Sequence, residues 1–449
     1  MDELNILETD GISVSIPETG DINIFGSISQ FTGDCLATNE IFGLVEDFSH
    51  DYYCPHCYCT RDSISHTFNE NEFVSRGKIE HAKDLKELEE AEGSVLHIRG
   101  QKRDSVLNRS KYYHTSESRT IDIMHILPEG ILMIVMSCVL FEFMHVRKKI
   151  TLETLNARLL NMFSVLEVEK GNTPAQLNDI KSPGLGLSPK LTANECLSLF
   201  RHLTYILSDL VEDEDTDDHW KLLIQLQEVT DIVFAPKLTE SLLNYFSEVY
   251  TNHLKLFQKL YPDLPIKPKQ HFLIHLPSVV RKNGPPTYSS CLKYELRNSF
   301  YKRITHITCN FKNIAKTLAI RNQLVSLAYS VNRSRMRNKC EKTHKCEKIL
   351  ISNLPGSCEL SSKLNLPTNA VIRMSTKARI CGRRYSKGNV VILRKRPQNR
   401  VLEFGQIISV VWCDSEAYCK RLHGVCILSL TGMNIRIMRF AHNVTFYCV

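Results

Sequence analysis

The pattern of apolar and polar positions predicts a strand followed by helices. Residues 21–34 read as a β-strand that ends at the pair Gly33-Asp34, and from 35 to 48 the apolar spacing becomes helical. A charged helix over 81–93 is stopped by its final glycine. The first part of the chain is therefore expected to contain one strand of a mixed α/β core.

A helix-rich region follows and is expected to form a bundle. Apolar residues recur at helical spacing in several segments between 122 and 329, and the Pro/Gly/Asn-rich stretch 169–190 is expected to be a loop between two of them. The longest apolar run, 131–144, is too short to cross a bilayer and contains Glu142. We expect it to be a buried helix of a soluble protein.

The sequence pattern changes again near the C-terminus, from helical spacing to short strand-like runs. After a basic linker at 331–367, short β-branched runs alternate with turns from 368 to 449. They predict strands at 370–374, 389–396, 404–412, 425–430, 434–440 and 443–449. This pattern is typical of a small β-rich domain.

Composition and charge narrow the class of protein. The 449 residues are 43% hydrophobic and 23% charged, as in soluble globular proteins. The N-terminus lacks the features of a secretory signal, so a reducing compartment is expected, in which the 16 cysteines stay thiols, bind metal or are buried. Residues 331–449 hold 22 Lys and Arg against 6 Asp and Glu, whereas residues 1–330 hold 34 against 43. A basic C-terminal part of this kind favours contact with polyanions.

Three positions are candidates for chemistry. Cys54 and Cys57 have CxxC spacing, with Cys59 two residues further on, but structural zinc normally takes four ligands and no second CxxC or HxxxH lies within about 20 residues. The pair is therefore either a redox or bystander motif, or half of a zinc site that closes across a long stretch of chain. His271 and His275 are spaced to share one face of a helix, although two histidines packed among apolar neighbours would look the same.

The acidic candidates are weaker when taken alone. Asp34 follows the predicted strand, where an aspartate is most often a turn or N-cap residue. Glu295 lies in an otherwise apolar and basic helix, 20 residues beyond His275. The chain has no P-loop, no GxGxxG after a strand, no GxSxG and no HExxH, which removes support for other enzyme classes.

The order of these elements resembles a transposase family. A strand ending in Asp, a CxxC pair, a DxMH element, a helical insertion, HFLxH, GPP and a Glu-bearing helix follow one another as in the CACTA/Mirage/Chapaev-type cut-and-paste DDE transposases and the transposon-derived proteins of animal genomes. The stretches that carry the resemblance are TGDCLATNEIFGLVEDFS, YYCPHC, TIDIMHILPEG, KPKQHFLIHLP and KYELRNSFYKRITHITCNFKNIAKTLAIRNQL. Together they cover roughly residues 1–330.

The resemblance implies a fold and a set of roles. These enzymes use an RNase H-like fold in which three carboxylates hold two divalent metals, Mg²⁺ or Mn²⁺, at a phosphodiester. Asp34 matches the second carboxylate and Glu295 the third. In the related V(D)J recombinase the CxxC and two-histidine elements form one zinc site, which implies that Cys54, Cys57, His271 and His275 hold one structural Zn²⁺ here. Asp122 and His125 match the DxMH signature, whose role stays open between metal ligand, core hydrogen bonding and DNA contact.

The chain also departs from the family pattern. The first catalytic carboxylate is expected on an upstream strand, and Asp2, Asp10 and Asp21 lie in the wrong element to replace it. In DIMHILPEG, Ile126 and Pro128 stand where relatives tend to carry an acidic and an aliphatic residue. The resemblance therefore predicts an N-terminally truncated protein that is catalytically incomplete.

The expected fold class is α/β plus mostly α, a partial RNase H-like core interrupted by a helical insertion and followed by a small β-rich domain. The expected domains are 1–60, the partial core with CxxC; 61–130, the zinc-proximal loop and DxMH segment; 131–265, the helical insertion; 266–330, the HxxxH and Glu-bearing helices; 331–367, the basic linker; and 368–449, the basic β-rich domain.

Three functions are compatible with this sequence. The first is a transposon-derived DDE transposase-like protein that binds nucleic acid but does not cut it. The second is an active transposase or nuclease completed by a further N-terminal segment. The third is a zinc-stabilised structural or interaction protein with a basic β domain. DNA is the expected partner, in the nucleus or cytoplasm; no membrane is expected, and self-association into a homo-oligomer is left open.

Overall fold

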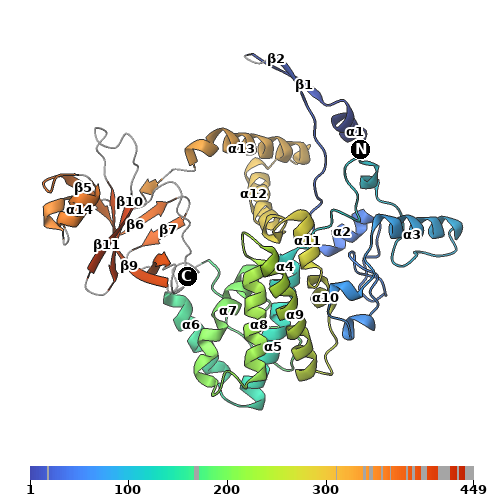
Figure 1. Ribbon diagram of the computed structural model, residues 1–449, viewed down its shortest axis with the longest axis horizontal. Helices are drawn as coiled ribbons and strands as arrows, with labels where there is room; N and C mark the ends of the chain where they lie inside the picture. The colour runs from blue at the N-terminus through green and yellow to red at the C-terminus, as the bar shows by residue number, and fades with distance from the viewer. Residues whose placement is uncertain are drawn as a thin grey trace. The chain divides into compact units, whose positions relative to one another are not determined.

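The structure is a computed structural model whose residues group into two units, Met1–Arg303 and Ile304–Val449. It is mostly helical, with small antiparallel sheets (Figure 1). It describes residues 1–439 apart from 18–19, 166–170, 310, 337–339, 343–346, 355–356, 365, 381–382, 387–389, 396–401, 413–424 and 432–433.

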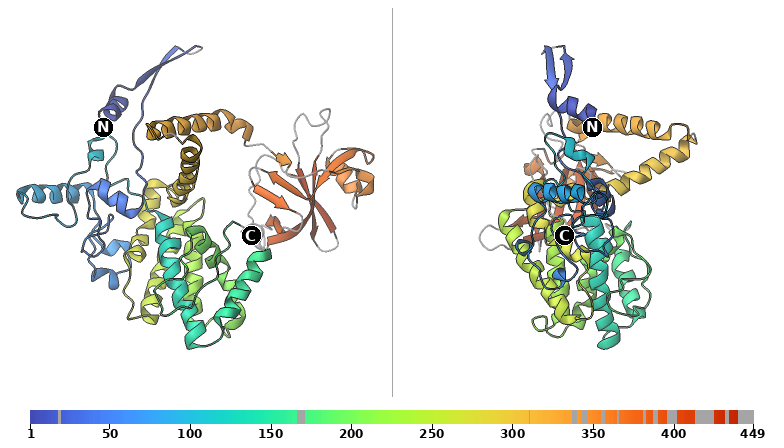
Figure 2. Two further views of the ribbon diagram at one scale, coloured as in Figure 1. Left: turned by 180° about the vertical axis from the view of Figure 1, so that it is seen from behind. Right: turned by 90° about the vertical axis from the view of Figure 1, so that its right-hand side faces the viewer.

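The N-terminal segment is a helix and a hairpin. Helix α1 (Asp2–Thr9) precedes strands β1 (Ile12–Ile16) and β2 (Gly20–Ile24), which pair antiparallel with Ile12 opposite Ile24. Every residue of both strands is exposed, and the hairpin projects away from the helices (Figure 2). A two-stranded ribbon without a third strand or a packing helix has little stability of its own.

The predicted strand over 21–34 is wrong beyond its start. Strand β2 ends at Ile24, and residues 25–34 form no strand, only an isolated bridge between Phe31 and Arg119. Asp34 is the N-cap of helix α2 (Cys35–Phe42) and does not end a strand. The physical reason is that 25–34, which contains two glycines, finds no neighbouring strand whose ladder would satisfy its backbone. The described residues therefore do not show an RNase H-like core.

Residues 43–122 form a loop-rich layer with short helices. Its elements are η1 (Ser63–Ser65), η2 (Glu70–Glu72), α3 (Lys78–Glu90) and η3 (Val106–Arg109). The predicted charged helix is present as α3, which ends three residues before Gly93.

A helical bundle forms the core of the first unit. It begins with a continuous helical run from Ile123 to Val146 and continues through four more helices, with α5, α7, α8 and α9 side by side (Figure 1). The bounds are α4 (Ile123–Ile126), η4 (Leu127–Ile131), α5 (Leu132–Phe141), η5 (Glu142–Val146), α6 (Leu152–Val165), α7 (Ala193–Leu207), η7 (Ser208–Leu210), α8 (Asp218–Val233) and α9 (Glu240–Leu260).

The apolar run at 131–144 lies at the centre of this bundle. By length and composition the run Ile123–Val146 could cross a membrane, but 78% of its most apolar window is buried inside the protein. Leu132, Leu140 and Phe143 have no exposed surface at all. The segment therefore fits the predicted core helix.

Side-chain caps define where the surrounding helices begin. Thr192 and Glu195 form a capping box at the start of α7, and the side chains of Asp217 and Thr239 accept backbone N–H groups at the starts of α8 and α9. Such caps satisfy the backbone donors that the first helical turn leaves unpaired.

The remaining helices of the first unit return toward the loop-rich layer. They are α10 (Pro268–Leu273), α11 (Leu276–Asn283), η8 (Pro286–Tyr288) and α12 (Leu292–Thr308), the last of which continues into the second unit. The predicted helical stretch at 291–329 is thus two helices, α12 and α13 (Ile314–Met336).

The second unit continues from α13 into antiparallel strands. β11-β10-β9-β5-β4 form one sheet in that order, with β8 also pairing β9, and β3-β6-β7 form another. The bounds are β3 (Cys340–Lys342), β4 (Glu347–Leu350), η9 (Ile351–Asn353), α14 (Ser357–Leu364), β5 (Val371–Ser375), β6 (Lys377–Ile380), β7 (Arg383–Ser386), β8 (Val390–Lys395), β9 (Leu402–Trp412), β10 (Val425–Thr431) and β11 (Asn434–Arg439). The first five predicted strand runs coincide with β5, β8, β9, β10 and β11, and the sixth, 443–449, lies outside the described residues.

Candidate metal centre and acidic cluster

The CxxC pair and the two histidines lie together, although more than 200 residues separate them. Cys54 Sγ is 3.6 Å from His275 Nε2, and Cys57 Sγ is 3.2 Å from His271 Nε2. The two Nε2 atoms are 3.4 Å apart, and all four residues are at most 2% exposed. Tetrahedral zinc with Zn–S of about 2.3 Å and Zn–N of about 2.0–2.1 Å has S···N edges of about 3.5 Å and N···N edges of about 3.4 Å. These three distances are therefore close to those between ligands of one zinc ion.

A third thiol belongs to the same group. The ligand atoms of Cys54, Cys57, Cys59 and His271 all lie within 4.8 Å of one another, and all four residues are buried. This cluster can hold a metal such as zinc. With His275 it offers five donors for the four positions of a structural zinc. We call these five residues the clasp, because they join the loop at 54–59 to helices α10 and α11.

The two histidines are not on one continuous helix. Helix α10 ends at Leu273 and α11 begins at Leu276, with His275 as its N-cap at φ −82°, ψ 0°. Pro277 at the second position of α11 lacks the N–H that a continuous helix would use, which favours a break before it. Both imidazoles still face the cysteines, as the predicted i, i+4 spacing required.

Charges within the clasp favour a metal-binding thiolate. Burial opposes ionisation of Cys54, but hydrogen bonds from the Cys57 and Cys59 thiols and the charges on His275 and His271 lower the pKa of its thiol well below the ordinary value. Burial lowers the pKa of His275, and the charges of Cys54 and Glu70 outweigh it and raise that pKa to about 9. These interactions favour the thiolate form of Cys54, which is the form that binds metal.

A buried arginine holds the cysteine loop in shape. The Arg76 guanidinium donates from Nε to the carbonyls of Cys54 (2.8 Å) and Cys57 (3.2 Å), and from Nη2 to the carbonyls of Tyr52 and Arg99 (both 2.7 Å). Its side chain is 2% exposed and lies 3.9 Å from the buried carboxylate of Asp84 on α3. One planar cation thus supplies the hydrogen-bond donors for all four of these carbonyl groups.

A carboxylate outside the clasp orients one of the histidines. His275 Nδ1 is 3.1 Å from Glu70 Oε1, which also accepts the Ser278 hydroxyl at the start of α11. A carboxylate on the remote nitrogen of a metal-binding histidine fixes the ring and raises its basicity. His271 Nδ1, by contrast, has no hydrogen-bond partner within the described parts of the chain.

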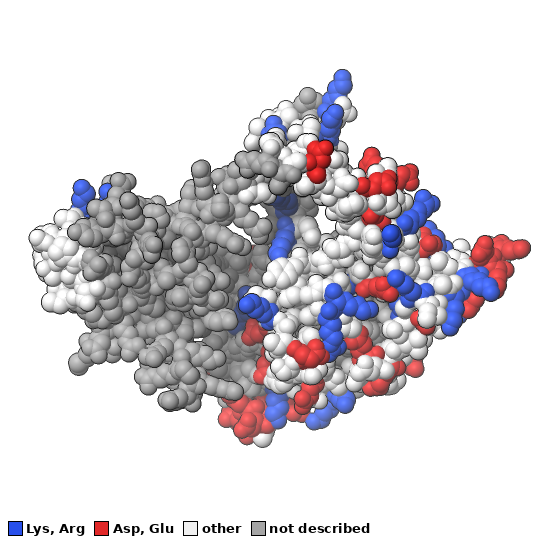
Figure 3. All heavy atoms as spheres, turned by 45° about the horizontal axis from the view of Figure 1, so that its top comes forward, with Lys and Arg blue, Asp and Glu red and all other residues white. Residues whose placement is uncertain are grey.

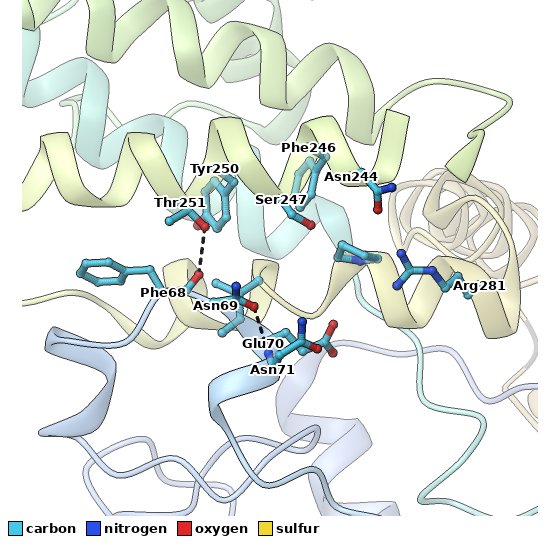
Figure 4. Close-up of a pocket in the computed structure, with 12 residues that line it drawn as sticks. Phe68, Asn69, Glu70, Asn71, Asn244, Phe246, Ser247, Tyr250, Thr251 and Arg281 are labelled. Carbon is cyan, nitrogen blue, oxygen red and sulfur yellow. Dashed lines mark hydrogen bonds between the residues drawn. The ribbon is translucent and has the colours of Figure 1, made fainter. Parts of the chain in front are cut away.

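Glu70 also lines a cavity of about 210 Å³ between η2, α9 and α11 (Figure 4). The wall from α9 includes Asn244, and α11 contributes Arg281, which lies on the same side of the cavity. Thr251 donates to the carbonyl of Phe68 across it at 3.3 Å. The Glu70 side chain, whose carboxylate supports the clasp, is 25% exposed, so water reaches it.

Substitution of Glu70 by Gln is expected to weaken zinc binding without emptying the clasp. Loss of such a supporting carboxylate costs about 10–100-fold in metal affinity. Competition with a chromophoric chelator measures the change, and Glu72→Gln, on the same short helix but exposed, serves as the control. Equal zinc affinity for Glu70→Gln and the unmodified protein would refute a supporting role for Glu70.

The DxMH residues form a second cluster with α12. The Asp122 carboxylate accepts the backbone N–H groups of Met124 (3.3 Å) and Cys291 (2.9 Å) and pairs with His125 Nδ1. Asp122 is 3% exposed. A carboxylate oxygen of Asp122, a ring nitrogen of His125 and the sulfur of Cys291 all lie within 4.8 Å of one another. Burial would raise the pKa of Asp122, but the hydrogen bonds from His125 and Cys291 lower it. Asp122 thus connects the start of α4 to the start of α12.

The two predicted catalytic carboxylates lie near this cluster. Burial raises the pKa of the Cys291 thiol to about 12, and the charges of Asp122, Asp34 and Glu295 add to the effect. The side chain of Asp34 accepts the backbone N–H of Ala37 at 2.7 Å, which is the N-cap role that competes with catalysis. Glu295 is exposed in the first turn of α12. Cys291 thus lies beside Asp122 and His125, and the charges of Asp34 and Glu295 act on it. We call these five residues the acidic cluster.

In comparisons with known proteins, no family model matches the chain and no curated protein is similar enough to count as a match. Inference about function therefore depends on the clasp and the acidic cluster.

Several residues of both sites were not predicted from the sequence as parts of them. Glu70 and Arg76 act on the clasp from separate turns of the loop layer, and no local spacing connects them with it. Glu129 had a signal, since it lies four residues after His125, where helical neighbours meet. Cys59 stood out in the sequence, but the CxxC spacing directed attention to its two neighbours.

Proposed function

We propose that the protein is a DDE transposase-like protein with a zinc-stabilised core, and that it binds DNA but does not cut the strand. The observation that supports the proposal is the clasp, since residues from two distant segments place thiol and imidazole donors 3.2–3.6 Å apart, in the set that the resemblance implied. In the acidic cluster, Asp122 connects the start of α4 to the start of α12, and the charges of the carboxylates matched to the second and third catalytic positions act on Cys291. The excess of Lys and Arg over 331–449 supplies contacts for phosphate, and nuclear localisation would follow from this role.

Zinc is inferred to take Cys54, Cys57, His271 and His275. Three separations among their donor atoms, 3.2–3.6 Å, are close to those in a tetrahedral shell, and Glu70 supports His275 as it would a metal ligand. Cys59 then stays a neighbouring thiol that donates to Cys54, which is consistent with its hydrogen bonding in the cluster. When bound, the ion would supply structural cross-linking of the loop layer to α10 and α11.

Strand cleavage by two metals requires carboxylates that are free to bridge the ions. In the acidic cluster, Asp122 already accepts two backbone N–H groups and pairs with His125, and Asp34 caps α2. Of these carboxylates, Glu295 is exposed, Asp34 is half-buried and Asp122 is buried. This arrangement favours binding without cutting.

On the face drawn in Figure 3, Lys and Arg side chains lie among Asp and Glu side chains over the described surface of the first unit. Mixed charge of this kind gives no strong single-sign field. The proposed DNA contact therefore depends on the basic residues of 331–449, most of whose side chains lie outside the described residues.

DNA retention is expected at low salt and should fall steeply as salt rises, because phosphate contacts release counterions. The measurement is a filter-binding titration of duplex DNA at several salt concentrations, with supercoiled plasmid and Mg²⁺ or Mn²⁺ in parallel to detect nicking. If the protein retains no duplex DNA at any of the salt concentrations, the DNA-binding function is refuted. Nicking that disappears in Glu295→Gln would instead show an active nuclease.

A second candidate, a zinc-stabilised interaction protein, is favoured by one observation. The hairpin β1–β2 places Ile12, Val14, Ile22 and Ile24 on one face through its register, and each is at least 37% exposed. An exposed apolar face on a ribbon is typical of protein contact. Partner binding that is insensitive to salt, together with no DNA retention, would favour this function.

A further inference from the structure

The helical run that carries the DxMH residues is interrupted beside His125. Residues Leu127–Ile131 form a π-turn, and Glu129 inside it has φ −96° and ψ 16°, outside the helical range. Pro128 lacks the N–H that a regular helix would use at this place, which accounts for the interruption. Single π-turns within helices are frequent at functional sites.

The interruption leaves the side chains of His125 and Glu129 close together. His125 Nε2 is 3.8 Å from Glu129 Oε2, and the side chains are 28% and 25% exposed, so both reach solvent. They are two donors of different chemistry, an imidazole nitrogen and a carboxylate oxygen, at the surface of an otherwise buried segment.

Asp122 fixes which nitrogen of His125 faces outward. Its buried carboxylate pairs with Nδ1, while its other oxygen accepts the backbone N–H of Cys291 at 2.9 Å. Nδ1 is therefore engaged with Asp122, which leaves Nε2 as the ring nitrogen that faces Glu129. A carboxylate–histidine pair of this kind is the usual support of a metal-binding imidazole.

The charges around the pair favour a cation. Asp122 pairs with His125 Nδ1, Glu129 lies 3.8 Å from its Nε2, and the charge of Asp34 also acts on the ring. Lys269 is the opposing group, and its Nζ donates to the backbone carbonyl of Glu129 at 2.8 Å. Three carboxylates against one lysine leave the pair in a negative environment.

We propose that His125 Nε2 and the Glu129 carboxylate are ligands of one divalent transition-metal ion, with Asp122 as the positioning residue. The open coordination positions would be filled by water or by an oxygen of a bound anion, such as a phosphate. An imidazole ligand favours Co²⁺, Mn²⁺ or Zn²⁺ over Mg²⁺, which prefers oxygen donors. The metal site would act together with the acidic cluster and in this sense rests on the proposed function. Its metal binding can still be tested without nucleic acid.

The test uses the full chain with its clasp already loaded with zinc, and Co²⁺ as the probe. Unmodified protein should bind one Co²⁺ per chain with visible d–d absorption and without a thiolate-to-cobalt band. Such a band would come from the clasp or from Cys291, whose sulfur lies within 4.8 Å of the ligand atoms of Asp122 and His125, and it would contradict the proposed ligand pair. His125→Ala and Glu129→Gln should each weaken this binding by at least about 10-fold, and Asp122→Asn by about 10–100-fold. Added Mg²⁺ should not displace the Co²⁺.

His145→Ala is the matched control, because His145 lies in the same helical run and pairs with Asp179 at 2.9 Å. It should bind Co²⁺ as the unmodified protein does. Co²⁺ binding that is absent in the unmodified protein, or unchanged in the folded His125→Ala variant, overturns the proposal. DNA retention measured on the same preparations separates the two questions, since either can fail while the other succeeds.

Discussion

Substitution of Cys57 by Ser is expected to abolish stoichiometric zinc binding and to unfold the loop layer of the first unit. Cys57 is 1% exposed, and its sulfur lies 3.2 Å from His271 Nε2, so serine cannot supply the soft ligand that this position needs. Structural zinc contributes about 10–16 kcal/mol of apparent binding free energy in zinc-finger peptides, which becomes folding free energy when the site does not exist in the unfolded chain. We therefore expect a fall in zinc content from about one per chain to near zero, measured by metal analysis, with loss of the first thermal transition.

The matched control is Cys196→Ser, because Cys196 is also fully buried, in α7, and is not part of the clasp. It should destabilise the bundle modestly and leave the zinc content unchanged. A chelator should reproduce the effect of Cys57→Ser on the unmodified protein. If Cys57→Ser keeps its zinc and its thermal transition, the clasp is not a metal site.

Substitution of Arg76 by Ala is expected to cost about 3–5 kcal/mol in the free energy of unfolding, as for removal of one member of a buried charged pair. The carbonyls of Cys54, Cys57, Tyr52 and Arg99 would lose their donor, and the hydrogen bonds to the first two are buried. The buried carboxylate of Asp84 would also lose one of its positively charged neighbours. Denaturant unfolding of the zinc-loaded protein measures the change.

Arg76→Lys separates charge from geometry. An ammonium group keeps the charge but cannot span carbonyls on both sides as a planar guanidinium does, so most of the loss should remain. Arg158→Ala, an exposed ion pair with Asp209 on the bundle surface, should change stability by less than about 1 kcal/mol. An Arg76→Ala variant as stable as Arg158→Ala would contradict the assigned role.

The sequence allowed the helices to be predicted because apolar periodicity leaves a strong local signal. Apolar residues at helical spacing marked the buried run at 131–144. The pairing of CxxC with HxxxH came from the resemblance, since no local spacing connects residues 214 positions apart. Physical proximity at that range is a property of the whole fold.

The strand at 21–34 was predicted wrongly because alternation alone does not supply a partner. A strand is stable when a neighbour satisfies its backbone, and beyond Ile24 this segment has an isolated bridge and no ladder among the described residues. The loss of this strand also removes the described support for an RNase H-like core. Conversely, Arg76 and Glu70 lie in turns with no periodicity, so only the folded arrangement relates them to the clasp.

X-ray absorption at the zinc edge of the purified protein tests the central claim most directly. We expect one zinc per chain, with two sulfur ligands at about 2.3 Å and two nitrogen ligands at about 2.0–2.1 Å. That shell corresponds to Cys54, Cys57, His271 and His275, and it would place Cys59 outside the coordination sphere. Three sulfurs with one nitrogen, a shell of oxygen ligands, or protein purified without zinc would contradict it.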